Sequence, residues 1–259
     1  MERLSWQVRA GRWLFRHRSH MPVLFAVLFL PAVESFKLNQ HSSLQQLKWE
    51  LVCLGISLLG LAVRVMTVAY VSEASSGREL SAPKAEQLNT TGSYSLVRNP
   101  LYVGNSIIWL GVSSMMQLWW LSLSILLISL LYYRLIICAE EYYLGVRFGQ
   151  SYVKWAKKTP TFIPSIRYWA PPELPFSMAM VIRREYSGFF QIIATFAFMN
   201  AMLNYAAQGV LAVHFVFQYL LIAASVICGA IWVIVKRTSW LPAPDRSNIK
   251  TSTTASEQN

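Results

Sequence analysis

The sequence predicts an all-α integral membrane protein with about six transmembrane helices. Hydrophobic residues make up 54% of the 259 residues and charged residues only 14%, whereas a soluble domain carries roughly a quarter charged residues. The mean hydropathy is +0.37. The apolar residues also gather in runs of the length that an α-helix needs to cross a bilayer. These observations set the fold class before any motif is considered.

Each expected span is an apolar segment bounded by polar residues, glycine or proline. The spans are 21–36, 51–71, 101–116, 118–138, 187–206 and 210–235. Only a turn around Gln117 separates the third span from the fourth, so these two are predicted to form an antiparallel hairpin. The first span also has features of a cleavable signal peptide. Because Glu34 intrudes and no small-residue cleavage site follows, a retained span is favoured.

The spans divide the chain into five regions. These are a basic N-terminal segment (1–20), the first two spans (21–71), a core of loop, hairpin and cap (72–164), an interfacial segment with the last two spans (165–240), and a polar tail (241–259). The composition of the tail predicts disorder. The N-terminal segment holds five arginines among aromatic residues, which fits either a helix in the headgroup layer or a simple orientation signal.

Lysine and arginine are distributed unequally between alternate loops, and this predicts the orientation. The N-terminal segment, loops 72–100 and 139–186, and the C-terminal tail hold 19 of them, whereas the opposite side holds only Lys37 and Lys48. Cytoplasmic loops carry the excess of positive charge. Both termini and both large loops are therefore predicted to be cytoplasmic, in the inner membrane of a bacterial cell or in the endoplasmic reticulum of a eukaryotic one.

The same composition argues against several other classes of function. The net charge of +11 arises from short loops between apolar spans, and no basic-aromatic module for nucleic acid is present. Cys53, Cys138 and Cys228 all fall inside apolar spans and are expected to be buried small hydrophobes. The four histidines are scattered. Neither a disulfide framework nor a metal site is predicted.

A first polar cluster precedes the third span. Asn99 and Pro100 are typical of a helix start, where asparagine caps free amides and proline fits the first helical position. Arg98 places a fixed cation beside this helix N-terminus, which already favours an anion. Gly104 lies on the same face one turn later and permits close approach, and Tyr102 adds a ring and a hydroxyl. A ligand site and a simple helix start are both consistent with these residues.

A second polar cluster follows the fourth span. Glu140 and Glu141 are adjacent carboxylates at a membrane exit, where low dielectric demands a cation. Arg134 and Arg64 are the arginines placed inside apolar spans, and each either extends to the headgroups or meets a partner. The hairpin between the two clusters returns them to one membrane face. An active site is therefore expected at the cytoplasmic face.

The ordered motifs resemble the isoprenylcysteine carboxyl methyltransferase family and the related membrane phospholipid methyltransferases. The resemblance rests on T-G-x-Y-x-x-x-R-N-P-x-Y-x-G at 91–104, the apolar hairpin, Glu140-Glu141, F-G-x-x-Y at 148–152 and P-x-F-x-P at 160–164. It covers roughly residues 86–164. Two positions depart from the family, because Asn99 stands where the family has histidine and Ile136 stands where it has an arginine assigned to substrate.

The resemblance implies S-adenosylmethionine as cofactor and a lipid or lipid-linked methyl acceptor that enters from the bilayer. The implied cofactor-binding residues are Leu88, Asn89, Tyr94, Asn99, Pro100, Leu101, Tyr102, Gly104 and Glu140. Glu140 would neutralise the amino group or the sulfonium. Catalytic roles fall to Arg98, Arg134 and Glu141, of which Glu141 or Arg134 would face the acceptor and Arg134 replaces the missing family arginine. The acceptor group, a carboxylate, a phosphate or an amine, is left open.

Two other functions remain alternatives at this point. Membrane sterol reductases that use NADPH contain a similar arginine-aromatic-proline-tyrosine element, although they usually have more spans. A non-catalytic membrane scaffold that keeps the fold is the other alternative. Consumption of NADPH by the purified protein would favour the first, and failure to bind any adenosine-containing ligand would favour the second.

The predicted topology has a direct test. Reporter fusions at Lys48 and Gly209 are expected to be external, and fusions at Pro83 and Asn259 internal, because of the charge asymmetry between alternate loops. A reversed signal at any one of the four positions would contradict the claim that both polar clusters share a membrane face.

Overall fold

The computed structural model describes residues 5–18, 25, 27–29, 31–33, 43–71 and 87–237. Within these residues every regular element is helical, so the predicted all-α class is confirmed. The helices are α1 (Trp6–Arg16), α3 (Ser43–Val68), α4 (Ser93–Leu96), α5 (Pro100–Ser114), α6 (Trp119–Phe148), α7 (Gln150–Lys158), α8 (Met178–Gln208) and α9 (Phe215–Arg237), with a 3-10 turn, η3 (Ile166–Tyr168).

Four described helices are long and apolar enough to cross a membrane. They are Leu44–Val68 in α3, Trp119–Phe148, Met178–Gln208 and Phe215–Arg237. The predicted third span is helix α5, whose 15 residues extend about 22 Å and fall short of a hydrocarbon core of about 30 Å. The predicted first span, 21–36, lies largely outside the described residues. The chain is therefore a multi-pass membrane protein with four helices of spanning length rather than the expected six in the part described.

Three of these helices extend beyond the bounds expected from hydropathy. α3 begins at Ser43 rather than 51, α6 continues to Phe148 rather than 138, and α8 begins at Met178 rather than 187. Each extension is amphipathic or polar, which a hydropathy window excludes although the backbone remains helical. The segment expected as an interfacial cap from Glu140 onwards is thus first a continuation of α6, and only then α7 and an irregular connection.

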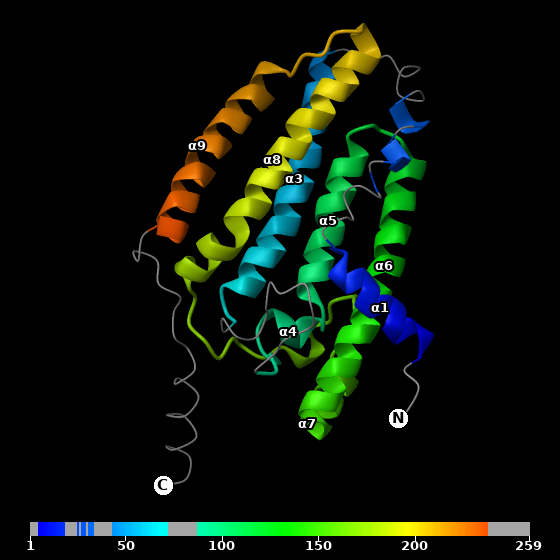
Figure 1. Cartoon of the computed structure of the whole chain (residues 1–259), viewed down its shortest axis with the longest axis vertical. Coiled ribbons are helices and arrows are strands. Elements are labelled where there is room, and N and C mark those ends of the chain that lie inside the picture. The colour runs from blue at the N-terminus through cyan, green and yellow to red at the C-terminus, as the bar shows by residue number, and fades with distance from the viewer. Residues whose placement is uncertain are drawn as a thin grey trace.

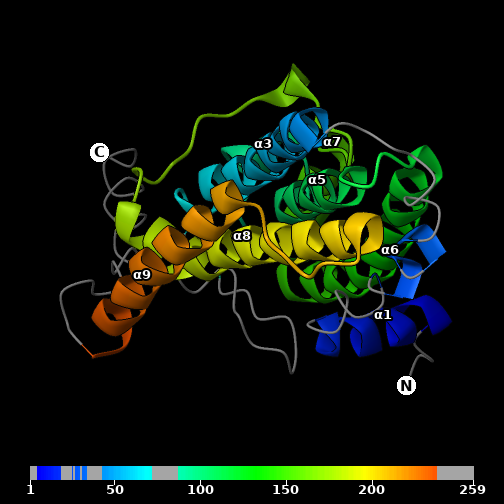
Figure 2. The same cartoon turned by 90° about the horizontal axis from the view of Figure 1, so that it is seen from above.

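The long helices run side by side and alternate in direction (Figure 1). α5 returns antiparallel to α3, and the turn at Gln117, which has a φ of 56°, leads into α6. This confirms the predicted hairpin. α9 packs on α8 at one flank, while α1 lies across α6 at the other (Figure 2). We call the end of the bundle that holds Arg64, Pro100 and Glu140 the site end, and the end that holds Glu50 and Met115 the opposite end.

The site end lies about one membrane thickness from the opposite end. Glu140 is 21 residues beyond Trp119 in α6, which corresponds to about 32 Å along the helix. Arg64 is 20 residues beyond Leu44 in α3, or about 30 Å. Both distances match the hydrocarbon thickness of a typical bilayer. The stretch of helix between the two ends is therefore long enough to cross the hydrocarbon core.

Helices α3 and α5 approach each other closely through glycine. A Cβ added at Gly60 would lie 2.6 Å from the Gly104 carbonyl oxygen and 2.8 Å from the Ile108 amide nitrogen. A Cβ at Gly104 would lie 2.7 Å from Cγ of Arg64. Small residues allow membrane helices to approach until their backbones touch. The Arg64 side chain consequently lies directly across the α5 backbone.

A second polar network fastens the opposite end. Glu50 is 1% exposed, and its carboxylate accepts hydrogen bonds from Gln46 at 2.9 Å and Asn200 at 2.8 Å. The Asn200 side-chain oxygen in turn accepts from the backbone amide of His214 at 2.7 Å. Gln117 donates to Gln46 at 2.7 Å. These four hydrogen bonds, none of which involves a charged donor, tie α3, the α5–α6 turn, α8 and the α8–α9 connection together.

The glycine contact predicts a site-specific loss of stability. Gly60→Ala is expected to destabilise the protein by about 1–3 kcal/mol, because the new methyl group meets α5 backbone atoms that cannot move independently. Gly55→Ala is the matched control, since Gly55 is on the same helix and nothing lies within 4 Å of its added Cβ. Thermal unfolding of both variants in detergent measures the difference. Equal melting temperatures would contradict the close-contact assignment.

Candidate active site

Residues 94–98, before α5, are hydrogen-bonded to residues 155–165, at the end of α7 and in the connection that follows it. The Arg98 amide donates to the Pro160 carbonyl at 2.8 Å, and the Ser165 amide donates to the Leu96 carbonyl at 2.9 Å. The Trp155 indole donates to the Tyr94 carbonyl at 3.1 Å. These bonds satisfy backbone groups that lack a helical partner. They also bring the first polar cluster against residues 155–165, more than fifty residues later in the chain.

Asn99 does not cap α5 with its side chain, which corrects the expected role. It is the N-cap residue and Pro100 follows at the first helical position, but no side-chain capping bond forms. The side-chain nitrogen of Asn99, Nδ2, instead donates to the Thr161 carbonyl at 3.1 Å. This hydrogen bond to the P-x-F-x-P segment replaces a capping bond and orients the Asn99 side chain away from the helix amides. The first-turn amides of α5 are therefore left without this side-chain cap.

Tyr102 and Glu140 join the two predicted clusters. The Tyr102 hydroxyl donates to Oε1 of Glu140 at 2.9 Å. The Tyr102 ring also stacks on the Tyr133 ring, with the ring centroids 4.7 Å apart. Tyr133 precedes Glu140 in α6 by about two helical turns. Glu140 thus has a phenol donor rather than the arginine partner considered from the sequence. Among the described residues, its second oxygen accepts no further hydrogen bond.

Arg98 and Glu141 form an ion pair beside this contact. Nη1 of Arg98 lies 2.8 Å from Oε1 of Glu141, and the side chains are 18% and 29% exposed. Nη2 of Arg98 contacts the Thr161 hydroxyl. The remaining Arg98 donor, Nε, is buried without a hydrogen-bond partner in the described part of the chain. A buried unsatisfied donor on a cation favours an anion nearby.

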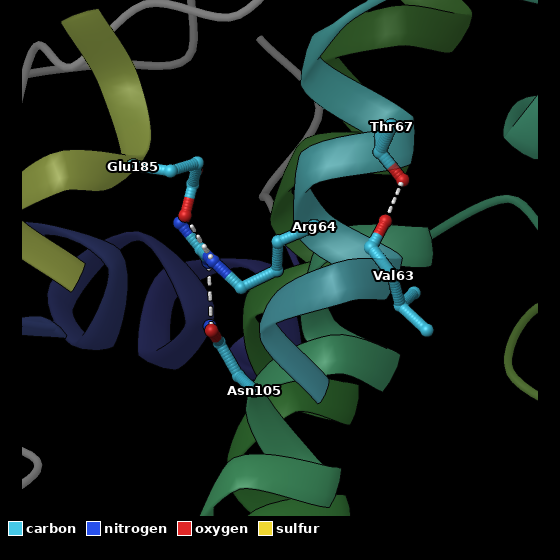
Figure 3. Close-up of polar contacts among 5 residues, drawn as sticks. All are labelled: Val63, Arg64, Thr67, Asn105 and Glu185. Atoms are coloured by element: carbon cyan, nitrogen blue, oxygen red, sulfur yellow. Dashed lines mark hydrogen bonds and ion pairs between the residues drawn. The ribbon is translucent and has the colours of Figure 1, made fainter. Parts of the chain in front are cut away.

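Arg64 is held in a buried network of its own (Figure 3). Its Nε and Nη2 donate to the two oxygens of Glu185 at 2.9 and 2.8 Å, and its Nη1 donates to Asn105 at 2.7 Å. The Glu185 side chain is only 5% exposed. Bidentate pairing of this kind is the strongest geometry for an arginine and a carboxylate. Arg64 therefore meets a partner inside the bundle and does not extend to the headgroups.

Tyr94 lies between these networks. Desolvation of its hydroxyl raises the pKa of Tyr94 to about 12, and the Glu140 carboxylate adds to the rise. Arg184 and Arg64 are close enough for their charges to oppose it. Tyr152 behaves similarly, since desolvation raises its pKa to about 12 with Glu141 adding and Arg98 opposing. Both phenols therefore stay protonated at neutral pH and can donate hydrogen bonds.

Several predicted residues make no comparable contact. Arg134 is exposed on α6 and forms no described bond with Glu140 or Glu141. Leu88 and Asn89 are half-buried in the chain before α4, and Leu101 is half-buried in the first turn of α5. Gly104 is buried, and the space beside it is filled by Arg64 and α3. The functional roles expected for these residues stay predictions.

Sequence reasoning missed the residues that complete the networks. They are Asn105, Tyr133, Thr161 and Glu185. Of these, only Glu185 could have been predicted from the sequence. Arg64 lies inside an apolar span and needs a partner, and few acids lie close to the spans. Hydropathy placed Glu185 outside the fifth span, although it is the eighth residue of α8. Asn105 and Thr161 are common residue types whose importance arises only from where the helices bring them.

The sequence that carries this geometry is similar to known proteins. Residues 51–151 match the phospholipid methyltransferase family. The match confirms the resemblance to membrane phospholipid methyltransferases. The matched segment contains Arg64, Arg98, Tyr102, Glu140 and Glu141. Glu185 lies beyond it. No solved structure matches the chain.

Two curated relatives are similar to the chain over 119 residues at 29% identity, which is 46% of this chain and 55% of each relative. One is the nickel-cobalt-cadmium resistance protein NccN of Alcaligenes xylosoxydans xylosoxydans, and the other is the cobalt-zinc-cadmium resistance protein CzcN of Cupriavidus metallidurans. The chain thus spans about half the length of the curated relatives it matches. No group of three or more histidine, cysteine or acidic residues arranged for a metal ion occurs among the residues described.

The Arg64–Glu185 pair predicts a stability effect that is separable from chemistry. Glu185→Gln is expected to destabilise the protein by on the order of 3 kcal/mol, because it leaves a buried guanidinium without its counter-charge. A double variant, Arg64→Met with Glu185→Met, is expected to recover much of the loss, since it leaves no buried charge without a partner. Unfolding in detergent measures both. If the single variant melts like the native protein, the pair contributes no stability.

Proposed function

We propose that the chain transfers a methyl group from S-adenosylmethionine to a lipid or lipid-linked acceptor at the cytoplasmic membrane face. The observation that carries this proposal is the position of Glu140. It lies within the family-matched segment, toward the C-terminal end of the long helix α6, with one carboxylate oxygen held by Tyr102 and the other free of described partners. A carboxylate placed in this way suits a cationic ligand.

The residues at the site end fit the charge pattern of S-adenosylmethionine. That cofactor carries a cationic sulfonium, an ammonium and a carboxylate. Glu140 would hold the cationic part, and the unsatisfied Nε of Arg98 is the donor available to the carboxylate. Pro100 has no N–H and the Tyr102 and Val103 amides donate to the Asn99 carbonyl, so the Leu101 amide is the further donor that the first turn of α5 offers. The ring of Tyr94 supplies a surface for the nucleoside.

Bound S-adenosylmethionine supplies a methyl group that is already electrophilic. The chain's own residues therefore need only to position the two reactants in line and to exclude water. Tyr102 fixes the Glu140 carboxylate, and the Tyr133 ring fixes Tyr102 by stacking. The Arg98–Glu141 ion pair lies beside the Tyr102–Glu140 contact and would face the acceptor. A carboxylate or phosphate acceptor needs no base, whereas an amine requires one, for which Glu141 is the candidate.

The most direct test of the activity uses labelled cofactor. Membranes that contain the protein are incubated with methyl-labelled S-adenosylmethionine, and the label in the organic extract is counted. Label that depends on the protein supports the proposal. An extract without protein-dependent label, over a range of lipid mixtures, would contradict it. NADPH consumption by the same preparation would instead favour the reductase alternative.

Glu140→Gln separates a cofactor role from a structural one. The amide keeps the shape and most of the hydrogen bonding but removes the charge, so the affinity for S-adenosylmethionine is expected to fall about tenfold to hundredfold. Folding is expected to survive, because a neutral amide is easier to bury than a carboxylate. Calorimetric titration of the cofactor and the melting temperature in detergent are measured side by side.

Glu173→Gln is the matched control for this variant. Glu173 is an exposed acid in the connection before α8, and its neutralisation removes the same charge away from Tyr102. It is expected to leave cofactor affinity unchanged. Unchanged affinity in Glu140→Gln, together with a clear loss of stability, would make Glu140 a structural residue and remove the main support for the proposed site.

A further inference from the structure

Buried polar atoms without a hydrogen bond gather in one part of the molecule. Among the described residues, four buried side-chain nitrogen or oxygen atoms have no hydrogen-bond partner. Three of them are Nε of Arg98, Oε1 of Glu141 and the hydroxyl of Tyr152, whereas the fourth belongs to Ser129, about three turns earlier in α6. Buried polar atoms are nearly always bonded in folded proteins, so a cluster of exceptions points to a missing partner.

Tyr152 attaches helix α7 to the bundle. It is 7% exposed, while the other side chains of α7 are half-buried or exposed. α7 follows the end of α6 (Figure 1), and Gly149, with a φ of 51°, turns the chain between them. A Cβ added at Gly145 would lie 3.7 Å from Cδ1 of Tyr152, so the ring lies against the last turns of α6. Trp155 packs edge-on against this ring and donates to the Tyr94 carbonyl.

These contacts place the Tyr152 ring on the face of α6 that carries Glu141. Glu141 precedes Gly145 by four residues, so the two share one helix face. Arg98 reaches the same face, because its Nη1 lies 2.8 Å from Glu141. Desolvation is the main cause of the raised pKa of Tyr152, and beyond it Glu141 raises this pKa and Arg98 lowers it. No hydrogen bond of ordinary geometry joins the hydroxyl to a described side chain.

Arg98 leaves one donor nitrogen for a ligand. Its Nη1 pairs with Glu141, its Nη2 contacts the Thr161 hydroxyl, and its Nε is buried without a partner among the described residues. A carboxylate has two oxygens and is bound most strongly when each oxygen accepts its own hydrogen bond. The Tyr152 hydroxyl, which stays protonated at neutral pH, is the second unpartnered donor of the cluster. The two donors together match one carboxylate.

We propose that the Tyr152 hydroxyl and Nε of Arg98 together bind the carboxylate of S-adenosylmethionine. This inference rests on the proposed function and adds to it a binding residue from α7. Tyr152 lies one position beyond the family-matched segment and ends the F-G-x-x-Y motif, to which the proposed function gives no role. Because Gly145 and Trp155 hold the ring, the hydroxyl is oriented before the ligand arrives, which lowers the entropy cost of binding.

The neighbouring acids favour the cofactor rather than the acceptor as the source of this carboxylate. In an α-amino acid the ammonium and the carboxylate are attached to the same carbon, so their binding sites must adjoin. Glu140, which is proposed to hold the cationic part, is next in the chain to Glu141, and Glu141 holds Arg98. The Tyr102–Glu140 contact and the Arg98–Tyr152 donors can therefore bind the two charged groups of one ligand.

Tyr152→Phe tests the proposal, because it removes only the hydroxyl and keeps the ring that packs on Gly145 and Trp155. Two ligands are titrated calorimetrically into the purified full-length protein in neutral detergent. They are S-adenosylmethionine and its decarboxylated analogue, in which hydrogen replaces the carboxylate. The variant is expected to bind S-adenosylmethionine about tenfold or more weakly, since a hydrogen bond to a charged group is lost. Its affinity for the analogue is expected to stay within about twofold of the native value.

Tyr168→Phe is the matched control. Tyr168 is 47% exposed in η3, and loss of its hydroxyl is expected to change neither affinity. Equal losses for the two ligands in Tyr152→Phe, or no loss for either, would overturn the carboxylate role. Octanoate, a carboxylate on an acyl chain, is the third probe. Weaker octanoate binding with unchanged S-adenosylmethionine binding would assign the two donors to the acceptor and would also overturn the inference.

The native protein supplies an arm of the test that needs no variant. It is expected to bind the decarboxylated analogue at least about tenfold more weakly than S-adenosylmethionine, because both donors lose their acceptor. Equal affinity for the two ligands would overturn the carboxylate site even if Tyr152→Phe failed to fold, and would leave the methyl transfer itself standing. A native protein that binds neither ligand would overturn the proposed function, and this inference with it.

Discussion

The close crossing of α3 and α5 at Gly60 and Gly104 sets the position of the polar groups at the site end. Because the two backbones touch, Arg64 extends across α5 and reaches Asn105 on one side and Glu185 on the other. The same crossing fixes the start of α5. Tyr102, two residues after Pro100, then faces Glu140 on α6. A larger residue at either glycine would displace both networks together.

Each acid in the bundle is stabilised in a different way. Glu185 has a bidentate arginine, Glu141 has a partly exposed arginine, and Glu50 has two neutral amides. Glu140 has a single phenol and an oxygen free of described partners. Low dielectric makes an incompletely paired carboxylate costly, so such groups are retained mainly where a ligand completes them. This contrast, rather than acidity alone, distinguishes Glu140 from the structural acids.

Elements outside the family-matched segment complete the site end. α8 contributes Glu185 to Arg64, and α1 packs closely on α6 at Gly11, beside Leu135 and Ala139. Both elements pack on helices of the matched segment, α8 on α3 and α1 on α6. The matched segment therefore carries the core of the candidate site, while flanking helices decide which charges surround it.

The sequence by itself determined the membrane class, the helical hairpin and the return of the two polar clusters to one end. These follow from local hydropathy, chain length and a short turn, which need no knowledge of partners. It also named Tyr102, Arg98, Glu140 and Glu141 as candidates, because their motifs are ordered along the chain, and the structure brings these side chains together. Helix ends such as that of α6 were misjudged, since hydropathy falls before the backbone hydrogen bonding stops.

Only the tertiary structure decided which charges meet. Arg64 pairs with Glu185, 121 positions away, and Asn99 turns from the α5 amides to Thr161. Sequence spacing specifies which residues share a face of one helix, but it carries no information on how two distant helices rotate and approach. That rotation is set by packing at small residues such as Gly60 and Gly11. Partner choice among buried polar groups follows from it.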